Sequence, residues 1–220
     1  MITAALLAAG LLLVQGPMPL IEHRFAEDAG TFLAIGPSAK IVVFHDPALK
    51  APTTGALRFK YDIATGAFNA RILQASGDVL KNAKSIRFHV RADHNTLITL
   101  GLQEEEGGRY LAQVYAPKDE WQAVELSTSD FVLSVDGDSP KDPNGKLDLE
   151  LCGGVFVTDF AQFFAGVEEP NLAALFNVQK GPHTMFLDDF TIGSDSVTPA
   201  TTFRSTTSAT LNSPGTGSVG

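Results

Sequence analysis

The chain has 220 residues, a formal net charge of −9 at pH 7 and a sequence pI near 4.9. This length allows one domain of roughly 150 to 180 residues with a large buried core, plus terminal extensions. The acidic balance argues against nucleic acid and anionic membrane surfaces as partners, because both carry negative charge themselves.

The N-terminus contains an apolar run from Ala4 to Val14, which has the length of the central region of a signal peptide and is short for a membrane span. We therefore predict a signal peptide over residues 1–16 and a secreted or periplasmic protein, with no stable membrane insertion after its removal. No Lys or Arg precedes the run. An uncleaved anchor and a misassigned start are the alternatives. The single cysteine, Cys152, cannot form an internal disulfide, and we expect it to be buried as a small apolar side chain.

From residue 25 to residue 192, short segments of alternating apolar and polar residues are separated by turn residues. A period of two is typical of β-strands with one buried face, and long helical patterns are nearly absent. The expected strands are residues 57–62, 85–91, 96–102, 109–115, 121–126, 155–158 and 185–192. This pattern predicts an all-β domain, an antiparallel β-sandwich, over residues 17–193.

Residues 194–220 end the chain, and from Thr198 onward they are mostly Ser, Thr, Gly and Pro. Such a segment cannot bury enough apolar surface to offset the entropy lost on ordering. We predict a flexible tail. A linker to a further domain is the alternative.

Five short motifs occur in a characteristic order, at residues 24–30, 54–57, 121–131, 142–149 and 186–190. They comprise an aromatic residue before acidic residues and glycine, a small-residue turn, a W-x-x-V-x-L…S-D-F segment, a D-x-x-G-x-L-D-like turn and an F-L-D-D-F strand. In this order they resemble the galactose-binding-domain-like jelly roll found in many carbohydrate-binding modules. The resemblance implies a jelly-roll sandwich that binds carbohydrate. The chain also resembles the related domain of complex I intermediate-associated proteins, for which the shared fold does not imply sugar binding.

Two adjacent carboxylates, Asp188 and Asp189, lie in the last expected strand, where a buried charge without a partner costs several kcal/mol. A strand directs them to opposite faces, so at most one faces water. The resemblance implies a structural Ca²⁺ between the first turn and the last strand, held by Asp189 or Asp188, the Gly55 carbonyl, and Glu27 or a carbonyl near it. Without a metal, one aspartate would pair with an arginine or accept backbone N–H groups.

Polar side chains share faces of the expected strands 85–91 and 109–115. If both strands belong to a concave sheet, they form a shallow groove of planar donors, an amide and an aromatic ring. Sugars suit such a surface because they offer vicinal hydroxyls and an apolar C–H face. An ordinary polar outer face is the alternative. The predicted carbohydrate-binding residues are Asn69, Arg71, Arg87, His89, Arg91, Gln113 and Tyr115.

The sequence contains no recognisable catalytic arrangement. The five histidines are scattered, no GxSxG or phosphate-binding glycine loop occurs, and Cys152 has no evident base. We predict a protein that binds a polysaccharide or oligosaccharide and is not an enzyme. The alternative is a protein-interaction or assembly domain of the same fold. Exposure of Tyr115 and Trp121 together on a concave face would favour sugar, whereas burial of both would favour protein interaction.

Overall fold

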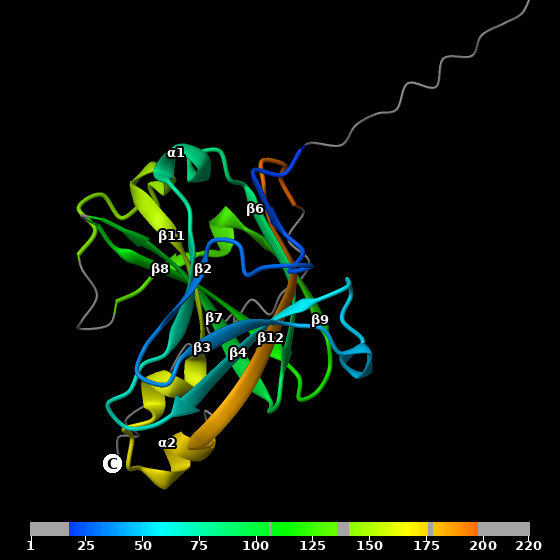
Figure 1. The fold of residues 1–220 in the computed structure, drawn as a ribbon. Helices are drawn as coiled ribbons and strands as arrows, with labels where there is room; N and C mark the ends of the chain where they lie inside the picture. Colours follow the sequence, from blue (N-terminus) through cyan, green and yellow to red (C-terminus); the bar gives the residue numbers. More distant parts are fainter. Residues whose placement is uncertain (1–17, 106, 136–140, 176–177, 198–220) are drawn as a thin grey trace, which may run out of the picture.

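The computed structural model describes residues 18–105, 107–135, 141–175 and 178–197, which form a sandwich of two antiparallel β-sheets (Figure 1). This arrangement confirms the predicted all-β sandwich. The predicted signal peptide at 1–16, and the tail from residue 198 onward, lie outside these ranges. Within the described ranges, no helix is long and apolar enough to cross a membrane.

Each sheet contains six strands. Sheet A has the order β3 (Lys40–Phe44), β4 (Ala56–Ile63), β12 (Gly181–Gly193), β6 (Ser85–Ala92) and β9 (Gln122–Ser127), and β1 (Ile21–His23) pairs with β12. Sheet B has the order β10 (Val132–Leu133), β8 (Arg109–Ala116), β7 (Thr96–Glu104), β11 (Cys152–Asp159), β5 (Ala70–Gln74) and β2 (Phe32–Ile35). All seven strands expected from the alternation are therefore present, and β1, β2, β3, β5 and β10 are additional.

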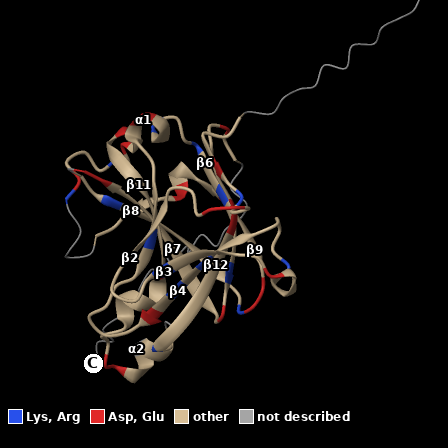
Figure 2. Ribbon diagram, in the orientation of Figure 1, with Lys and Arg blue, Asp and Glu red and all other residues tan. Residues whose placement is uncertain are grey.

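Short helices complete the described chain. The α-helices are α1 (Gly77–Leu80) and α2 (Pro170–Leu175), which lie at opposite ends of the sandwich (Figure 1). The 3₁₀ helices are η1 (Pro47–Leu49), η2 (Thr128–Asp130), η3 (Leu149–Leu151) and η4 (Phe160–Phe164). Charged residues are distributed over both sheets and the loops between them (Figure 2).

The core lies between the sheets and is built from the alternate residues of each strand, because successive side chains of a strand point to opposite faces. On β4, Phe59 and Tyr61 are buried as expected, with their ring centroids 4.8 Å apart. On β6, Phe88 is buried and stacks against Phe190 of β12. Cys152 is also buried, and this burial raises the pKa of its thiol to about 12.

Sheet B departs from the usual rule that apolar residues face inward. On β5, Arg71 is completely buried in the core, whereas its neighbour Ile72 is only half-buried on the outer face. On β2, Leu33 and Ile35 are each 46% exposed. The outer face of sheet B therefore carries more apolar side chains than is usual for a sheet face in contact with water.

Candidate functional site

A groove of about 380 Å³ lies on the outer face of sheet B. We call it the outer groove. Its lining comes from five strands, from the turn before β5 and from η4, and it is mostly apolar. The lining residues are Ile35, Phe68, Ala70, Ile72, Gln103, Arg109, Phe156 and Phe163.

The floor of the outer groove follows from the strand register. Phe156 of β11 lies opposite Ile72 of β5 on one side and opposite Gly101 of β7 on the other. A Cβ atom at Gly101 would lie 1.9 Å from two ring atoms of Phe156, so the ring lies directly over the glycine backbone. Any side chain at position 101 would displace the ring, and the glycine therefore shapes the floor.

Two phenylalanine rings form one end of the outer groove. Phe68 precedes β5, Phe163 belongs to η4, and their ring centroids are 5.3 Å apart. They are 42% and 41% exposed, although large aromatic side chains are usually buried. Asn69 follows Phe68 in the chain, and Gln162 precedes Phe163. Two reciprocal hydrogen bonds join these neighbours: Asn69 N–H donates to Gln162 Oε1 (2.8 Å), and Gln162 Nε2 donates to the Asn69 carbonyl (2.7 Å). These bonds fix the backbone beside both rings.

Polar groups lie farther along the same face. Arg109 Nε donates to Gln103 Oε1 at 3.2 Å, at the edge of the outer groove. Gln113 and Tyr115 follow on β8 and are both exposed, as expected. Tyr115 is 53% exposed and lines a second pocket, of about 250 Å³, beside Leu97 of β7. The face thus combines aromatic rings with planar hydrogen-bonding side chains.

The structure does not bring the seven predicted binding residues together. Arg87, His89 and Arg91 belong to β6 of sheet A, whereas Gln113 and Tyr115 belong to β8 of sheet B. The two groups are on different sheets of the sandwich. Arg87 pairs with acidic side chains, and Arg91 lies 3.7 Å from Asp119, which is typical of a solvated face.

Asn69 and Arg71 were expected to extend the groove, but both are fully buried. Asn69 supports the turn before β5: its Oδ1 accepts the Ser38 N–H at 3.0 Å, and its Nδ2 donates to the Asp62 carbonyl. Arg71 points into the core, because β5 presents Ile72 on the outer face. Neither side chain is exposed to a ligand in the outer groove.

The positions of Tyr115 and Trp121 favour neither of the two predicted functions over the other. Trp121 is half-buried before β9 of sheet A, and its indole N–H donates to the Leu49 carbonyl at 2.9 Å. Tyr115 is exposed on sheet B. The two rings are neither exposed together nor buried together.

Only one aspartate of the pair in β12 is fully buried, and a bulge at the other interrupts the regular alternation of the strand. Asp188 is completely buried and accepts hydrogen bonds from Thr53 N–H (2.7 Å), Thr53 Oγ1 (2.6 Å) and Asp189 N–H (2.7 Å). Asp189 has a positive φ of 48°, where the register of β12 against β6 shifts. Among the described residues, Glu27, Asp188 and Asp189 do not form a three-carboxylate cluster within 4.8 Å.

A different set of oxygens gathers beside Asp188. Thr53 Oγ1 lies 2.6 Å from Asp188 Oδ1, 3.1 Å from the Arg24 carbonyl oxygen and 3.3 Å from the Gly55 carbonyl oxygen. A hydroxyl carries one proton, so it can donate fully to only one of these three acceptors. A carboxylate, a hydroxyl and two carbonyls are ligand types that suit Ca²⁺. Asp188 and Gly55 of the predicted set belong to this cluster.

The sequence-based prediction missed the phenylalanines of the outer groove, Phe68, Phe156 and Phe163. A signal was present in η4, where three of five residues are phenylalanine. Five residues make less than two turns of 3₁₀ helix, so the three large rings cannot all pack against one neighbouring surface. At least one exposed ring was therefore to be expected there.

No protein-family model matches the chain, and no curated protein sequence matches it. Solved structures do share its fold. One is the family 11 carbohydrate-binding module from Clostridium thermocellum in complex with a β-1,3-1,4-mixed-linked tetrasaccharide, with 14% identity and a TM-score of 0.55 over 80% of this chain and 96% of that one. Another is an exo-β-agarase, with 12% identity and a TM-score of 0.54 over 84% of this chain and 25% of that one.

A third similar structure contains the CBM22-1 and GH10 modules of Clostridium thermocellum xylanase 10B complexed with xylohexaose. It has 10% identity and a TM-score of 0.50 over 83% of this chain and 30% of that one. At such identities the likeness concerns the fold. The protein has the jelly-roll β-sandwich of carbohydrate-binding modules, which confirms the fold predicted from the motifs.

Proposed function

We propose that this protein is exported and binds a polysaccharide or oligosaccharide without transforming it, on the outer face of sheet B. The observation that carries the proposal is the outer groove, where exposed phenylalanine rings lie beside Gln103 and Arg109. The C–H face of a sugar ring packs against aromatic rings, while its hydroxyls bond to planar amide and guanidinium groups. Two of the similar structures are described as oligosaccharide complexes, which supports the same ligand class.

The proposal gives the lining residues different roles. Phe68 and Phe163 supply the apolar platform, because their rings are exposed and fixed from behind by the bonds between Asn69 and Gln162. The N–H groups of Arg109 donate hydrogen bonds to sugar hydroxyls and so determine the orientation of the ligand in the groove. Tyr115 extends the same face toward the second pocket, about 20 Å along β8 from Arg109, so a ligand of several sugar units is needed to contact both places.

Affinity electrophoresis tests the proposal. The full-length protein is run with Ca²⁺ through gels that contain soluble mixed-linked β-glucan, xylan or agarose-derived polysaccharide. We expect retardation by one of these classes. Phe68→Ala and Phe163→Ala are each expected to weaken binding about tenfold or more, since an exposed ring that becomes buried in a complex contributes about 1.4 kcal/mol or more.

Arg91→Ala is the matched control, because it removes a polar residue from the opposite sheet. Its retardation should equal that of the unmodified protein. A loss of binding in Arg91→Ala, with Phe68→Ala unaffected, would place the site on sheet A and contradict the proposal. Thermal melts of all variants show whether any loss arises from unfolding.

A second candidate is a protein-interaction domain. The specific observation is the exposed apolar side chains around the outer groove, which include Leu33 (46% exposed) and Val132 (68% exposed). A continuous apolar patch is typical of a surface that another protein covers. Equal mobility in every polysaccharide gel would favour this candidate over sugar binding.

We also propose that Ca²⁺ binds at the oxygen cluster formed by Asp188, Thr53 and the carbonyls of Arg24 and Gly55. The proposal is supported by the surroundings of the Thr53 hydroxyl, which has three acceptor oxygens nearby but only one proton to donate. A cation there would link the segment before β4 to the last strand. Glu27 is exposed, and Asp189 follows the cluster at the bulge.

We expect Ca²⁺, added after EDTA treatment, to raise the melting temperature. At about 100 times the dissociation constant the ligand stabilises by about 2.7 kcal/mol, or about 5 to 10 °C for a domain of this size. Asp188→Asn should remove the Ca²⁺-dependent part of the shift, while Asp78→Asn, at an exposed carboxylate on α1, should keep it. Equal melting temperatures with and without Ca²⁺ would contradict this proposal.

A further inference from the structure

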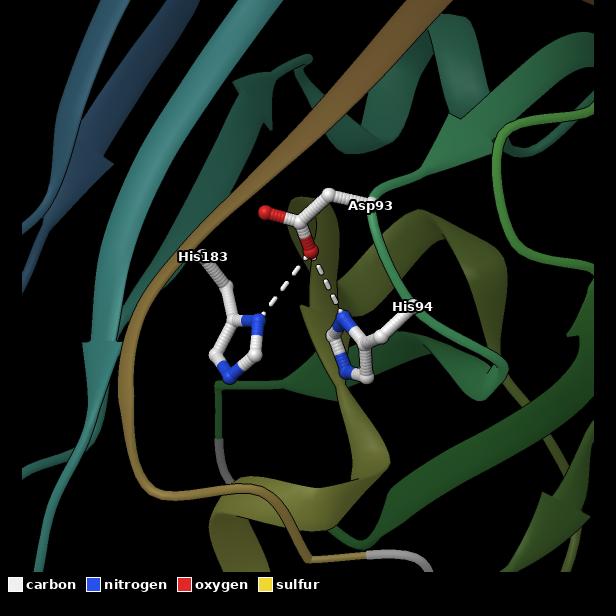
Figure 3. Close-up of side chains that lie close together, drawn as sticks. All are labelled: Asp93, His94 and His183. Atoms are coloured by element: carbon white, nitrogen blue, oxygen red, sulfur yellow. Dashed lines mark hydrogen bonds and ion pairs between the residues drawn. The ribbon is translucent and has the colours of Figure 1, made fainter.

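The side chains of two histidines and one aspartate lie close together (Figure 3). Asp93 and His94 directly follow β6, and His183 belongs to the first part of β12. Asp93 Oδ1 lies 2.8 Å from His94 Nδ1 and 3.0 Å from His183 Nδ1. One potential ligand atom of each residue lies within 4.8 Å of those of the other two. Three potential ligand atoms therefore face the same small volume.

The remaining polar atom of each side chain lies close to a separate partner. His94 Nε2 lies 2.9 Å from the Asp159 carboxylate, and His183 Nε2 lies 2.7 Å from the Gln179 carbonyl oxygen. Asp93 Oδ2 accepts the Thr184 N–H at 2.7 Å. Metal-binding histidines usually donate their second ring N–H to a carboxylate or carbonyl, and metal-binding carboxylates are themselves hydrogen-bonded. His183 and Asp93 show this pattern, whereas His94 Nε2 lies at ion-pair distance from Asp159 without the geometry of a hydrogen bond.

The outward partners determine what the inner atoms can do. The Gln179 carbonyl only accepts hydrogen bonds, so its contact requires a proton on His183 Nε2, and the negative charge of Asp159, 2.9 Å from His94 Nε2, favours a proton there as well. In the neutral imidazole, Nδ1 then carries a lone pair. Two such lone pairs and a carboxylate oxygen would repel one another. Extra protons on both rings, or a cation between the three atoms, remove the repulsion.

We propose that His94, His183 and Asp93 bind a divalent transition metal ion of the Zn²⁺ type. Imidazole nitrogen and carboxylate oxygen are ligands of Zn²⁺, at distances of about 2.0 to 2.2 Å. In a tetrahedral site such ligands lie about 3.3 Å apart. The separations of 2.8 and 3.0 Å between the carboxylate and each ring reach that value after a small outward movement of the rings, and the ligand atoms of the two histidines lie within 4.8 Å of each other. Water completes the coordination.

The surroundings allow the ion to enter and be retained. The His94 and His183 side chains are 3% and 10% exposed, whereas Asp93 is 37% exposed and lines a surface pocket of about 300 Å³. The bound ion would connect the turn between β6 and β7 to the start of β12. No residue of this cluster lines the outer groove. The metal site and the proposed carbohydrate site can therefore be tested separately.

Calorimetric titration of the EDTA-treated, dialysed full-length protein with Zn²⁺ at pH 7.5 tests the proposal. We expect one saturable site per chain, and we expect Co²⁺ in place of Zn²⁺ to give visible absorption bands of a nitrogen-ligated, low-coordinate ion. His183→Gln and Asp93→Asn should each lower Zn²⁺ affinity about 100-fold or more. His89→Gln, which removes a histidine from the middle of β6, should leave it unchanged.

The Co²⁺ spectrum of the unmodified protein supports or opposes the proposal even if a variant fails to fold. Zn²⁺ binding weaker than about 0.1 mM in the unmodified protein would show that protons alone hold the cluster, and it would overturn the proposal. Equal affinity in the folded His183→Gln and Asp93→Asn variants would overturn it too. Loss of Zn²⁺ binding with unchanged polysaccharide binding is the expected combined result.

Discussion

Substitution of Asp159 by Asn is expected to lower the free energy of unfolding by about 3 to 5 kcal/mol, because it breaks a buried charge pair from one side. Asp159 ends β11 and is completely buried. Its carboxylate accepts hydrogen bonds from the Tyr61 hydroxyl (2.6 Å) and the Thr96 hydroxyl (2.7 Å), and lies 2.9 Å from His94 Nε2. Asparagine has the same shape but turns one acceptor into a donor that faces other donors.

The charge of Asp159 is as important as its shape. Burial alone would raise its pKa, but hydrogen bonds from His94, Tyr61 and Thr96 lower it below the usual value. Burial would likewise lower the pKa of His94, yet the neighbouring carboxylates of Asp159 and Asp93 raise it to about 9. The metal-free pair is therefore ionised at neutral pH. An asparagine would leave the imidazolium of His94 without one of its two anions.

Urea unfolding of both proteins in EDTA measures the effect without a contribution from bound metal. Asp119→Asn is the matched control, since that carboxylate is 57% exposed and lies 3.7 Å from Arg91. Its loss should stay below about 1 kcal/mol. A loss of less than about 1 kcal/mol for Asp159→Asn would mean that the network is not held by the charge pair.

Alternation predicted strands well wherever one face is polar. In β6, Ile86, Phe88 and Val90 are buried, and the basic residues between them face outward. The pattern gives the strand and its inward face together, because a strand reverses its face at every residue. Strands whose two faces are both apolar give no such signal. For this reason β2 was missed, and β5 was missed because Arg71 occupies its inward face and breaks the alternation.

The candidate site was harder to predict than the fold, because the alternation within a strand does not say which sheet the strand joins. The basic face of β6 and the exposed face of β8 look equivalent in sequence, yet they belong to different sheets. The partners of Asp188 were predicted better. A buried aspartate needs several donors, and backbone N–H groups were among the expected ones. The bulge at Asp189 left no comparable sequence signal.

The buried position of Arg71 leads to an expected gain of stability. Its Nε and Nη1 atoms have no hydrogen-bond partner among the described residues, and Nη2 contacts only the Met185 sulfur. The guanidinium carbon lies 5.2 Å from the ring centroid of Phe59. Burial lowers the pKa of the guanidinium to about 9, which reflects the cost of holding this charge in an apolar core.

We expect Arg71→Met to raise the free energy of unfolding by about 1 to 4 kcal/mol, the range seen when buried charges give way to well-packed apolar side chains. Methionine keeps an unbranched stem and adapts to the space beside Met185 and Phe59. Arg91→Met, at a half-buried position on the other sheet, should change stability by less than about 1 kcal/mol. Urea unfolding at pH 7 measures both. A loss of stability in Arg71→Met would mean that the guanidinium contributes a favourable contact in the core, and the cation–π contact with Phe59 would then outweigh its desolvation.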